Sequence, residues 1–202
     1  MNTRTQRGFT LYELLVTILV MGVILGLGVP NLLEFTRNNR MTATANDMQT
    51  ALMLARSDAV KRRLPATLCA SPNPVAASPT CSADGSGTAG GYIVWQDDDA
   101  DAVVDGGETI LLQRDAPQDI TVFADSGYVH FGINGNVATV PATGVNAATA
   151  LLFCDARGNN VVSGTLSAAR GIRIAPTGRG RVMRETAEIA TLSGAPTNLA
   201  CP

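Results

Sequence analysis

The sequence has 202 residues, of which 46% are hydrophobic. This length and composition suit one folded domain with one membrane or stalk segment, and they exclude a protein with many membrane helices. The net charge of −2 says little about partners, because the charges are segregated along the chain. Residues 84–155 carry many acids and the single base Arg114, whereas residues 157–184 carry six arginines and no acid.

The N-terminus predicts a short basic leader followed by a membrane helix. Residues 1–8 are polar and contain arginines but no acid, and residues 9–29 form an apolar run of 21 residues. At about 1.5 Å per residue, such a helix matches the roughly 30 Å hydrocarbon core of a bilayer. The basic leader predicts a cytoplasmic N-terminus and an exported C-terminal part. Gly8, the small residue at this junction, lies before the apolar run, so cleavage there removes the leader and keeps the helix.

Glu13 is the one charged residue inside the apolar run. A carboxylate in a membrane segment is destabilising unless it is paired, so Glu13 indicates a functional site. Its candidate partner is the α-amine that cleavage after Gly8 creates on Phe9, in the same subunit or in a neighbouring one. The alternative is a glutamate near the membrane surface whose side chain extends to water.

The segment G-F-T-L-Y-E-L-L-V-T at residues 8–17 resembles the type IV prepilin signature. This resemblance implies that prepilin peptidase cleaves between Gly8 and Phe9 and that Phe9 is then N-methylated. It also implies that Glu13 directs docking of the subunit into a growing filament. Tyr12 departs from the aliphatic residue that is usual at its position.

A helix is predicted from residue 31 to about residue 64, after a weakened or kinked stretch at residues 22–30 that contains three glycines and Pro30. In this second part, apolar residues recur at three- and four-residue spacing, which predicts an amphipathic helix packed on a sheet. These residues are Met48, Leu52, Ala55 and Ala59. Pro65 is expected to end the helix.

Residues 66–202 are typical of short strands separated by turns. The candidate strands are 66–70, 91–96, 109–114, 120–124, 128–133, 136–140, 150–154, 171–175 and 181–184. Asn134-Gly135, between two apolar runs, predicts a two-residue hairpin turn.

The four cysteines allow three disulfide pairings and contain no C-x-x-C pair typical of a zinc site. We favour Cys69–Cys81, which closes a short loop, and Cys154–Cys201, which ties down the C-terminal tail. This pairing requires that the domain lies in an oxidising compartment.

Five acids between residues 97 and 108 have the spacing of an EF-hand calcium loop. Asp97, Asp99, Asp101, Asp105 and Glu108 occupy loop positions 1, 3, 5, 9 and 12. Position 6 is Ala102, where an EF-hand needs glycine, and the flanking segments are typical of strands. Calcium binding and a solvated acidic hairpin tip are therefore the alternatives, and we expect the acidic tip, with no metal or other cofactor.

Two further patterns are interpreted as structural. Gly85-x-Gly87-x-x-Gly90 matches a dinucleotide-binding pattern, but a strand follows it where a helix is required. His130 has no serine or cysteine motif near it that indicates a nucleophile. We therefore predict that the protein is not an enzyme.

The basic C-terminal part is a candidate phosphate-binding site. Arg179 and Arg181 lie two residues apart beside Gly178 and Gly180. Guanidinium groups bind phosphate bidentately, which suits sequence-independent contacts to a nucleic-acid backbone. Further arginines that extend the patch are Arg157, Arg170, Arg173 and Arg184. The alternative is a solvated basic strand edge that prevents aggregation and binds nothing.

Segments along most of the chain resemble minor pilins of the FimT/GspH type: ATLC, GYIVWQDDDADAVVDGGE, YVHFGINGNV, LLFCDARG and GIRIAPTGRGR. The resemblance implies an α+β, type IV pilin-like fold in which one long helix packs on antiparallel sheets. It implies a cleaved leader (1–8), a membrane and filament-core helix (9–30) and a periplasmic or extracellular domain (31–202) with a β-rich part (66–202). Gly178-Arg179-x-Arg181 also matches a G-R-x-R motif associated with DNA binding during natural transformation, which implies phosphate contacts by Arg179 and Arg181.

Two functions are supported by these features, and an exported enzyme tethered by its helix is a third class that no feature of the sequence supports. The first is a minor pilin of a type IV pilus that reaches the cell surface from the inner membrane and binds extracellular double-stranded DNA for uptake. Its expected partners are prepilin peptidase and other major and minor pilins. The second is a minor pseudopilin of a type II secretion system, with protein partners and no affinity for DNA.

Overall fold

The computed structural model describes residues 8–82, 91–142, 144, 146–193, 199 and 201. The chain divides into two compact units, residues 1–40 and residues 41–202, and helix α1 (Leu11–Arg62) contributes to both. The first seven residues of the leader and the Gly85-x-Gly87-x-x-Gly90 pattern lie outside the described residues.

In the first unit, α1 begins with a capping box formed by Thr10 and Glu13. The Glu13 N–H donates to Thr10 Oγ1 at 3.2 Å, and the Thr10 N–H donates to Glu13 Oε2 at 3.1 Å. The helix continues through Pro30, so the weakening expected at residues 22–30 does not interrupt it. By length and composition, its N-terminal part is apolar enough to cross a membrane.

In the second unit, the C-terminal part of α1 forms one side of the main hydrophobic core. The predicted stripe of Met48, Leu52, Ala55 and Ala59 is confirmed, since all four side chains are buried there. Three further buried residues, Met41, Ala45 and Ala51, complete this face. Alanine has a short side chain, so the strands pack close to the helix axis along this stripe.

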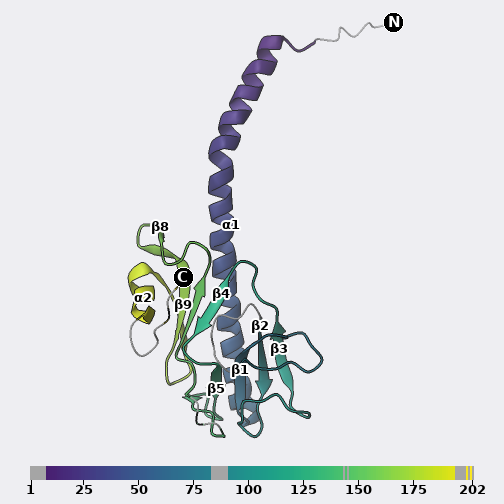
Figure 1. Cartoon of the computed structure of the whole chain (residues 1–202), viewed down its shortest axis with the longest axis vertical. Coiled ribbons are helices and arrows are strands. Elements are labelled where there is room, and N and C mark those ends of the chain that lie inside the picture. Colours follow the sequence, from purple (N-terminus) through teal and green to yellow (C-terminus); the bar gives the residue numbers. More distant parts are fainter. Residues whose placement is uncertain are drawn as a thin grey trace, which may run out of the picture. The chain divides into compact units, whose positions relative to one another are not determined.

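Two antiparallel sheets pack on this part of α1 (Figure 1). Sheet A has the strand order β3-β2-β1-β5-β6. Its strands are β1 (Ala66–Ser71), β2 (Gly91–Gln96), β3 (Ile110–Arg114), β5 (Tyr128–Phe131) and β6 (Val137–Ala138). Sheet B has the order β10-β9-β7-β4, and β8 pairs with β9. Its strands are β4 (Thr121–Ala124), β7 (Ala150–Cys154), β8 (Val161–Ser163), β9 (Leu166–Ile174) and β10 (Gly180–Glu185).

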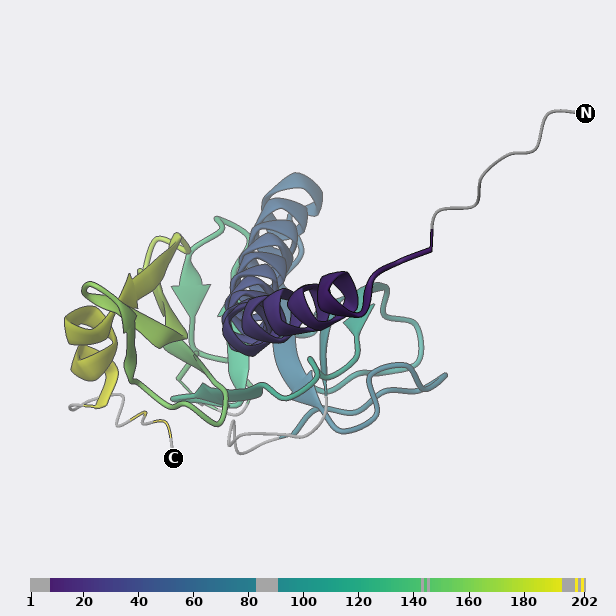
Figure 2. The ribbon, with the colours of Figure 1, turned by 90° about the horizontal axis from the view of Figure 1, so that it is seen from above.

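The two faces of sheet B enter different apolar clusters. Phe153 and Ile172 pack with α1 in the main core, whereas Leu152 and Ala169 pack with helix α2 (Thr186–Ala190) in a second cluster. Figure 2 shows α2 against β9 and β10 (green to yellow), away from the strands of sheet A (blue to teal). Successive side chains of a strand point to opposite faces of the sheet, so neighbouring residues of sheet B enter the two different clusters.

Each of the nine predicted strands overlaps an observed strand, and the predicted α+β fold with antiparallel sheets is confirmed. Three elements were not predicted: β8, α2 and the short helix η1 (Thr191–Ser193). The prediction that residues beyond Pro65 contain strands alone is therefore wrong. Each of these elements spans five residues or fewer, too short for a helical or alternating pattern to be visible in the sequence.

The hairpin predicted at Asn134-Gly135 is present, but its loop is longer than two residues. Phe131 of β5 faces Val137 of β6, so the loop spans residues 132–136. Gly135 takes a left-handed φ of 72°, and its N–H donates to the carbonyl of Gly132 at 2.8 Å. The Asn-Gly pattern therefore predicted the position of the turn correctly, but the predicted loop length of two residues is wrong.

The disulfides join Cys69 to Cys81 and Cys154 to Cys201, which is the pairing favoured from the sequence. Cys69 lies on β1 beside the buried Ile93 and Trp95. Cys154 ends β7 within the α2 cluster, so its bond to Cys201 holds the C-terminal tail against sheet B.

Candidate functional site

The G-R-x-R segment forms the turn between β9 and β10. The Gly178 N–H donates to the carbonyl of Ala175 at 2.8 Å, and the Ala175 N–H donates to the carbonyl of Arg179 at 2.9 Å. Gly178 has a φ of 77°, in the left-handed region that favours glycine. The first residue of the motif is therefore required by the geometry of the turn.

Close packing adds a second reason for glycine at this position. A Cβ on Gly178 would lie 2.2 Å from the carbonyl oxygen of Gly135 and 2.9 Å from Nε of Arg56. Arg56, on α1, donates from Nε to the same carbonyl oxygen at 3.0 Å. Nearby, the side-chain amide of Gln49 on α1 donates to the carbonyl of Gly180 at 3.1 Å. Helix α1 therefore bonds to the turn at Gly180, while Arg56 and the β5–β6 loop pack closely against Gly178.

Three arginines surround one open hollow beside this turn. Arg173 on β9 and Arg181 on β10 are direct cross-strand partners, and Arg179 lies in the turn between the two strands. All three side chains are exposed. Together with neighbouring residues of both strands, they line a hollow of about 810 Å³. The structure thus brings the two arginines of the motif and Arg173 to one surface.

Two of these arginines contact the segment that contains α2 and η1. Arg181 forms an ion pair with Glu188 of α2. Arg173 donates from Nη2 to the hydroxyl of Thr191 at 3.4 Å, and that hydroxyl donates to the carbonyl of Glu188 at 2.6 Å. Glu188 and Thr191 were not among the predicted site residues, because α2 itself was not predicted.

The remaining arginines of the patch are not equivalent to these three. Arg184 is exposed on β10. Arg157 forms an ion pair with Asp155 at 2.6 Å. Arg170 is 4% exposed, and its Nη1 donates to the carbonyls of Ser167 and Ala169. The expectation that Arg170 widens a surface patch is therefore wrong, because its side chain is buried. This burial, followed by the nearby charges of Arg184 and Arg157, lowers the pKa of its guanidinium.

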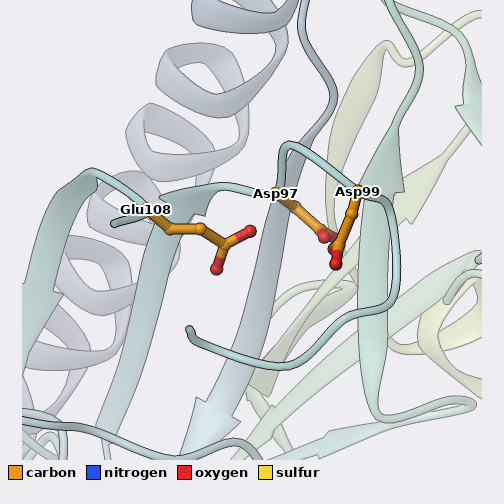
Figure 3. A group of neighbouring side chains, drawn as sticks. All are labelled: Asp97, Asp99 and Glu108. Carbon is orange, nitrogen blue, oxygen red and sulfur yellow. The ribbon is translucent and has the colours of Figure 1, made fainter. Parts of the chain in front are cut away.

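The acidic segment folds into a loop between β2 and β3 whose carboxylates lie close together. The carboxylates of Asp97, Asp99 and Glu108 lie within 4.8 Å of one another, and Figure 3 shows them converging. A second group with the same spacing is Asp99, Asp101 and Asp105. Ala102 takes the left-handed φ of 62° that glycine usually supplies at position 6 of a calcium loop.

The loop uses its own carboxylates as acceptors for backbone amides. Glu108 accepts the N–H groups of Asp98 at 3.0 Å and Asp105 at 2.9 Å, and Asp101 accepts the N–H of Val103 at 2.7 Å. Burial, together with the charges of Asp97 and Asp99, raises the pKa of Glu108. The acidic tip stays a prediction, and a calorimetric titration with calcium distinguishes it from a calcium site.

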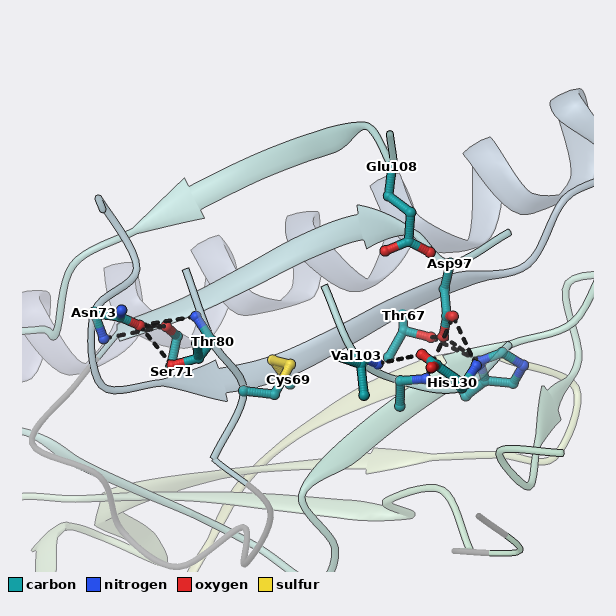
Figure 4. The surroundings of a disulfide bond; sticks show 12 residues. Thr67, Cys69, Ser71, Asn73, Thr80, Asp97, Val103, Glu108 and His130 are labelled. Atoms are coloured by element: carbon teal, nitrogen blue, oxygen red, sulfur yellow. Dashed lines mark hydrogen bonds and ion pairs between the residues drawn. A yellow bond between two sulfur atoms is a disulfide. The ribbon is translucent and has the colours of Figure 1, made fainter. Parts of the chain in front are cut away.

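Asp97 is fully buried and belongs to a polar network that the sequence did not reveal. Its Oδ2 accepts the Thr67 hydroxyl at 2.5 Å, and Thr67 Oγ1 lies 2.7 Å from Nδ1 of His130 (Figure 4). Its Oδ1 accepts the N–H of Asp101 at 3.1 Å. Burial opposes ionisation of Asp97, but hydrogen bonds from His130 and Thr67 outweigh it and lower the pKa of the carboxyl. His130 is thus a structural residue that joins β5, β1 and the acidic loop.

The predicted processing residues lie in the first unit. Phe9 is 81% exposed and precedes α1, while Glu13 lies in its first turn. The carboxylate of Glu13 accepts both the N–H and the hydroxyl of Thr10. In the uncleaved chain, Glu13 therefore already accepts two hydrogen bonds from Thr10, the residue before α1.

Comparison with known proteins identifies two matching family models. The model described as type II transport protein GspH matches residues 44–178, and the model of the prokaryotic N-terminal methylation motif matches residues 3–29. No curated protein matches the chain.

Two crystal forms of the type IV minor pilin FimU of Pseudomonas aeruginosa are similar in structure. The first has 20% sequence identity and a TM-score of 0.40, and the alignment covers 83% of this chain and 96% of the FimU chain. The second has 18% identity and a TM-score of 0.39, with coverages of 79% and 96%.

Proposed function

The chain belongs to the GspH family, and we propose that it is a minor pilin of a type IV pilus that binds extracellular double-stranded DNA through the β9–β10 turn. Membership of the family makes it a minor subunit of the pilin and pseudopilin class, a structural protein and not an enzyme. The family and the N-terminal methylation motif imply processing by prepilin peptidase and assembly with other pilins. They also imply an inner-membrane precursor that later enters a filament.

The processing steps follow from the residues at the start of α1. Cleavage between Gly8 and Phe9 gives Phe9 a free amine, which is then methylated. That amine competes with Thr10 for the carboxylate of Glu13, in the same subunit or in a neighbour. A single-pass orientation with a cytoplasmic N-terminus places residues 31–202 in the periplasm and, after assembly, at the cell surface.

The observation that carries the DNA proposal is the arginine set at the turn. Arg179 projects from a turn that α1 and the β5–β6 loop hold in place, and Arg173 and Arg181 flank the same hollow. Arg173 and Arg181 are like charges directly opposite each other on neighbouring strands, which is unfavourable, and among the described residues Glu188 offsets this repulsion at Arg181 only. A phosphodiester backbone supplies further anions at regular spacing, and guanidinium groups bind them bidentately.

The experiment is a titration of labelled duplex DNA with the mature full-length chain in detergent micelles, at several salt concentrations. Arg179→Ala with Arg181→Ala is expected to weaken binding by about tenfold or more, since each charge-assisted hydrogen bond contributes about 1.5 kcal/mol. The log–log salt slope should fall by about 0.9 to 1.8, because Arg179 makes one phosphate contact and Arg181 makes up to one more. The matched control is Arg62→Ala with Arg63→Ala at the end of α1, which removes the same charge elsewhere. Binding that is equal in the two double variants, or that is insensitive to salt, would contradict the proposal.

A second candidate function has its own support, because the matching family model is that of a type II transport protein. A minor pseudopilin of a type II secretion system would use residues 31–202 for protein contacts alone. It predicts no salt-dependent binding of DNA and a loss of secretion when the gene is deleted.

A further inference from the structure

Helix α2 holds Glu188 at a fixed place beside the arginine hollow. Its Ile189 and the following Leu192 are 1% and 0% exposed and pack in the second apolar cluster with β7 and β9. The Leu199 N–H donates to the carbonyl of Leu192 at 2.7 Å, and the disulfide between Cys154 and Cys201 joins the same cluster. Glu188 is therefore carried by an anchored backbone, so its pairing with a partner requires the ordering of its side chain but of no further backbone.

That partner is Arg181, which lies at the border of two hollows. Arg181 lines the hollow that contains Arg173 and Arg179, and it also lines a second hollow together with Glu188. Its side chain is 74% exposed, whereas that of Glu188 is 28% exposed. The guanidinium is accordingly open to an incoming anion, while the carboxylate that already pairs with it is partly shielded from water.

An anion that binds Arg181 meets this carboxylate in two ways. It competes with Glu188 for the donors of one guanidinium group, and it is repelled by the negative charge of Glu188 close by. Arg173 is subject to no such competition, because its contact on this segment is the neutral hydroxyl of Thr191. The acid thus opposes phosphate at one member of the cross-strand arginine pair.

We propose that Glu188 is a competing acid that weakens the binding of DNA phosphate at Arg181 and so limits both the affinity and the salt dependence of the site. This inference rests on the proposed function. If Glu188 instead positioned Arg181 for DNA, its presence would strengthen DNA binding. A competing acid has the opposite effect, because its presence weakens DNA binding.

The test is the same DNA titration with the mature full-length chain carrying Glu188→Gln, which removes the charge and keeps the size of the side chain. Binding is expected to become about two- to fivefold tighter, the range that corresponds to the loss of one exposed ion pair. The log–log salt slope should become steeper by up to about 0.9, because Arg181 then makes a full phosphate contact. An unchanged melting temperature shows that the variant is folded.

Two further variants separate pairing from a general charge effect. Glu185→Gln removes an acid that is exposed on β10 and that, within the described part of the chain, pairs with no arginine. It should change the affinity much less than Glu188→Gln. In a background that carries Arg181→Ala, the effect of Glu188→Gln should disappear, because the competition acts through that arginine.

Three results overturn the inference while the proposed function stands. In the first, Glu188→Gln binds DNA with the same affinity as the wild type or more weakly. In the second, Glu185→Gln tightens DNA binding as much as Glu188→Gln does, and in the third, Glu188→Gln still tightens DNA binding in the Arg181→Ala background. Absence of DNA binding by both the wild-type protein and Glu188→Gln overturns the proposed function and the inference together.

Discussion

At the scale of single residues, Gly178 shows how a short motif depends on the surrounding fold. A residue with a Cβ at this position is disfavoured by the left-handed φ of 77° and also collides with the carbonyl of Gly135. The motif glycine therefore serves the packing of the turn on α1 and the β5–β6 loop. This role is separate from any contact that the arginines make.

Gly178→Ala is expected to lower the free energy of unfolding by about 2–4 kcal/mol, the sum of backbone strain and a displaced loop. The matched control is Gly164→Ala, which has a similar φ of 57° but open space around the new Cβ. Denaturant unfolding of both full-length variants measures the difference. Equal losses of stability would show that the collision with Gly135 is unimportant.

Asp97 gives a pH dependence whose sign follows from its network. Its pKa is lowered in the folded protein, so its contribution to stability is complete above about pH 4, the usual range of an aspartate. The contribution is lost as the pH falls through the lower folded pKa. Wild-type protein should therefore lose stability towards pH 2 more steeply than Asp97→Asn, measured by urea unfolding across this range.

At neutral pH, Asp97→Asn should destabilise the protein by about 1–3 kcal/mol, because the buried hydroxyl of Thr67 and the His130 ring lose a charged partner. Asp99→Asn makes the same substitution at an exposed acid of the same loop and should have little effect. A pH profile of Asp97→Asn that matches the wild-type profile would show that another group controls stability in acid.

At the scale of secondary-structure elements, the fold was largely predictable from local patterns. The α1 stripe at three- and four-residue spacing and the nine strand segments are features of contiguous sequence, and all of them are present. The contacts that define the candidate site are not local. Arg56 and Gly135 are 79 residues apart, and Thr67 and His130 are 63 residues apart. The pairing of Arg181 with Glu188 required a helix of five residues, which has no detectable periodicity.

The two disulfides tie elements together over different lengths of chain. Cys154 and Cys201 are separated by 47 residues, and Cys69 and Cys81 by 12. Loop-closure entropy predicts that loss of the longer cross-link destabilises the protein by about 4 kcal/mol and loss of the shorter by about 3 kcal/mol.

Paired alanine substitutions, Cys154→Ala with Cys201→Ala and Cys69→Ala with Cys81→Ala, test this order by denaturant unfolding of the full-length chain. Removal of the longer cross-link should also release α2 and so reduce the effect of Glu188 on Arg181. A larger loss of stability from the Cys69–Cys81 pair would contradict the entropic order.

At the scale of the whole molecule, the segregation of charge matters more than the net charge of −2. Six acids lie between residues 97 and 108, in the loop between β2 and β3, where three of them accept backbone amides. Arg173, Arg179, Arg181 and Arg184 are exposed on β9, β10 and their turn. The apolar start of α1 is the third specialised part, suited to a membrane and then to a filament core. Under the proposed function, these three parts face different environments: lipid and then the filament for the start of α1, water for the acidic loop, and DNA for the arginines.

The proposed DNA-binding role is tested most directly in the native host, by replacing the chromosomal gene with the Arg179→Ala, Arg181→Ala variant. Natural transformation, pilus assembly and type II secretion are then measured in the same strain. Transformation should fall by about tenfold or more, in parallel with the loss of phosphate contacts, while assembly and secretion stay at wild-type levels. Normal transformation together with impaired secretion would contradict this role and assign the protein to the secretion filament.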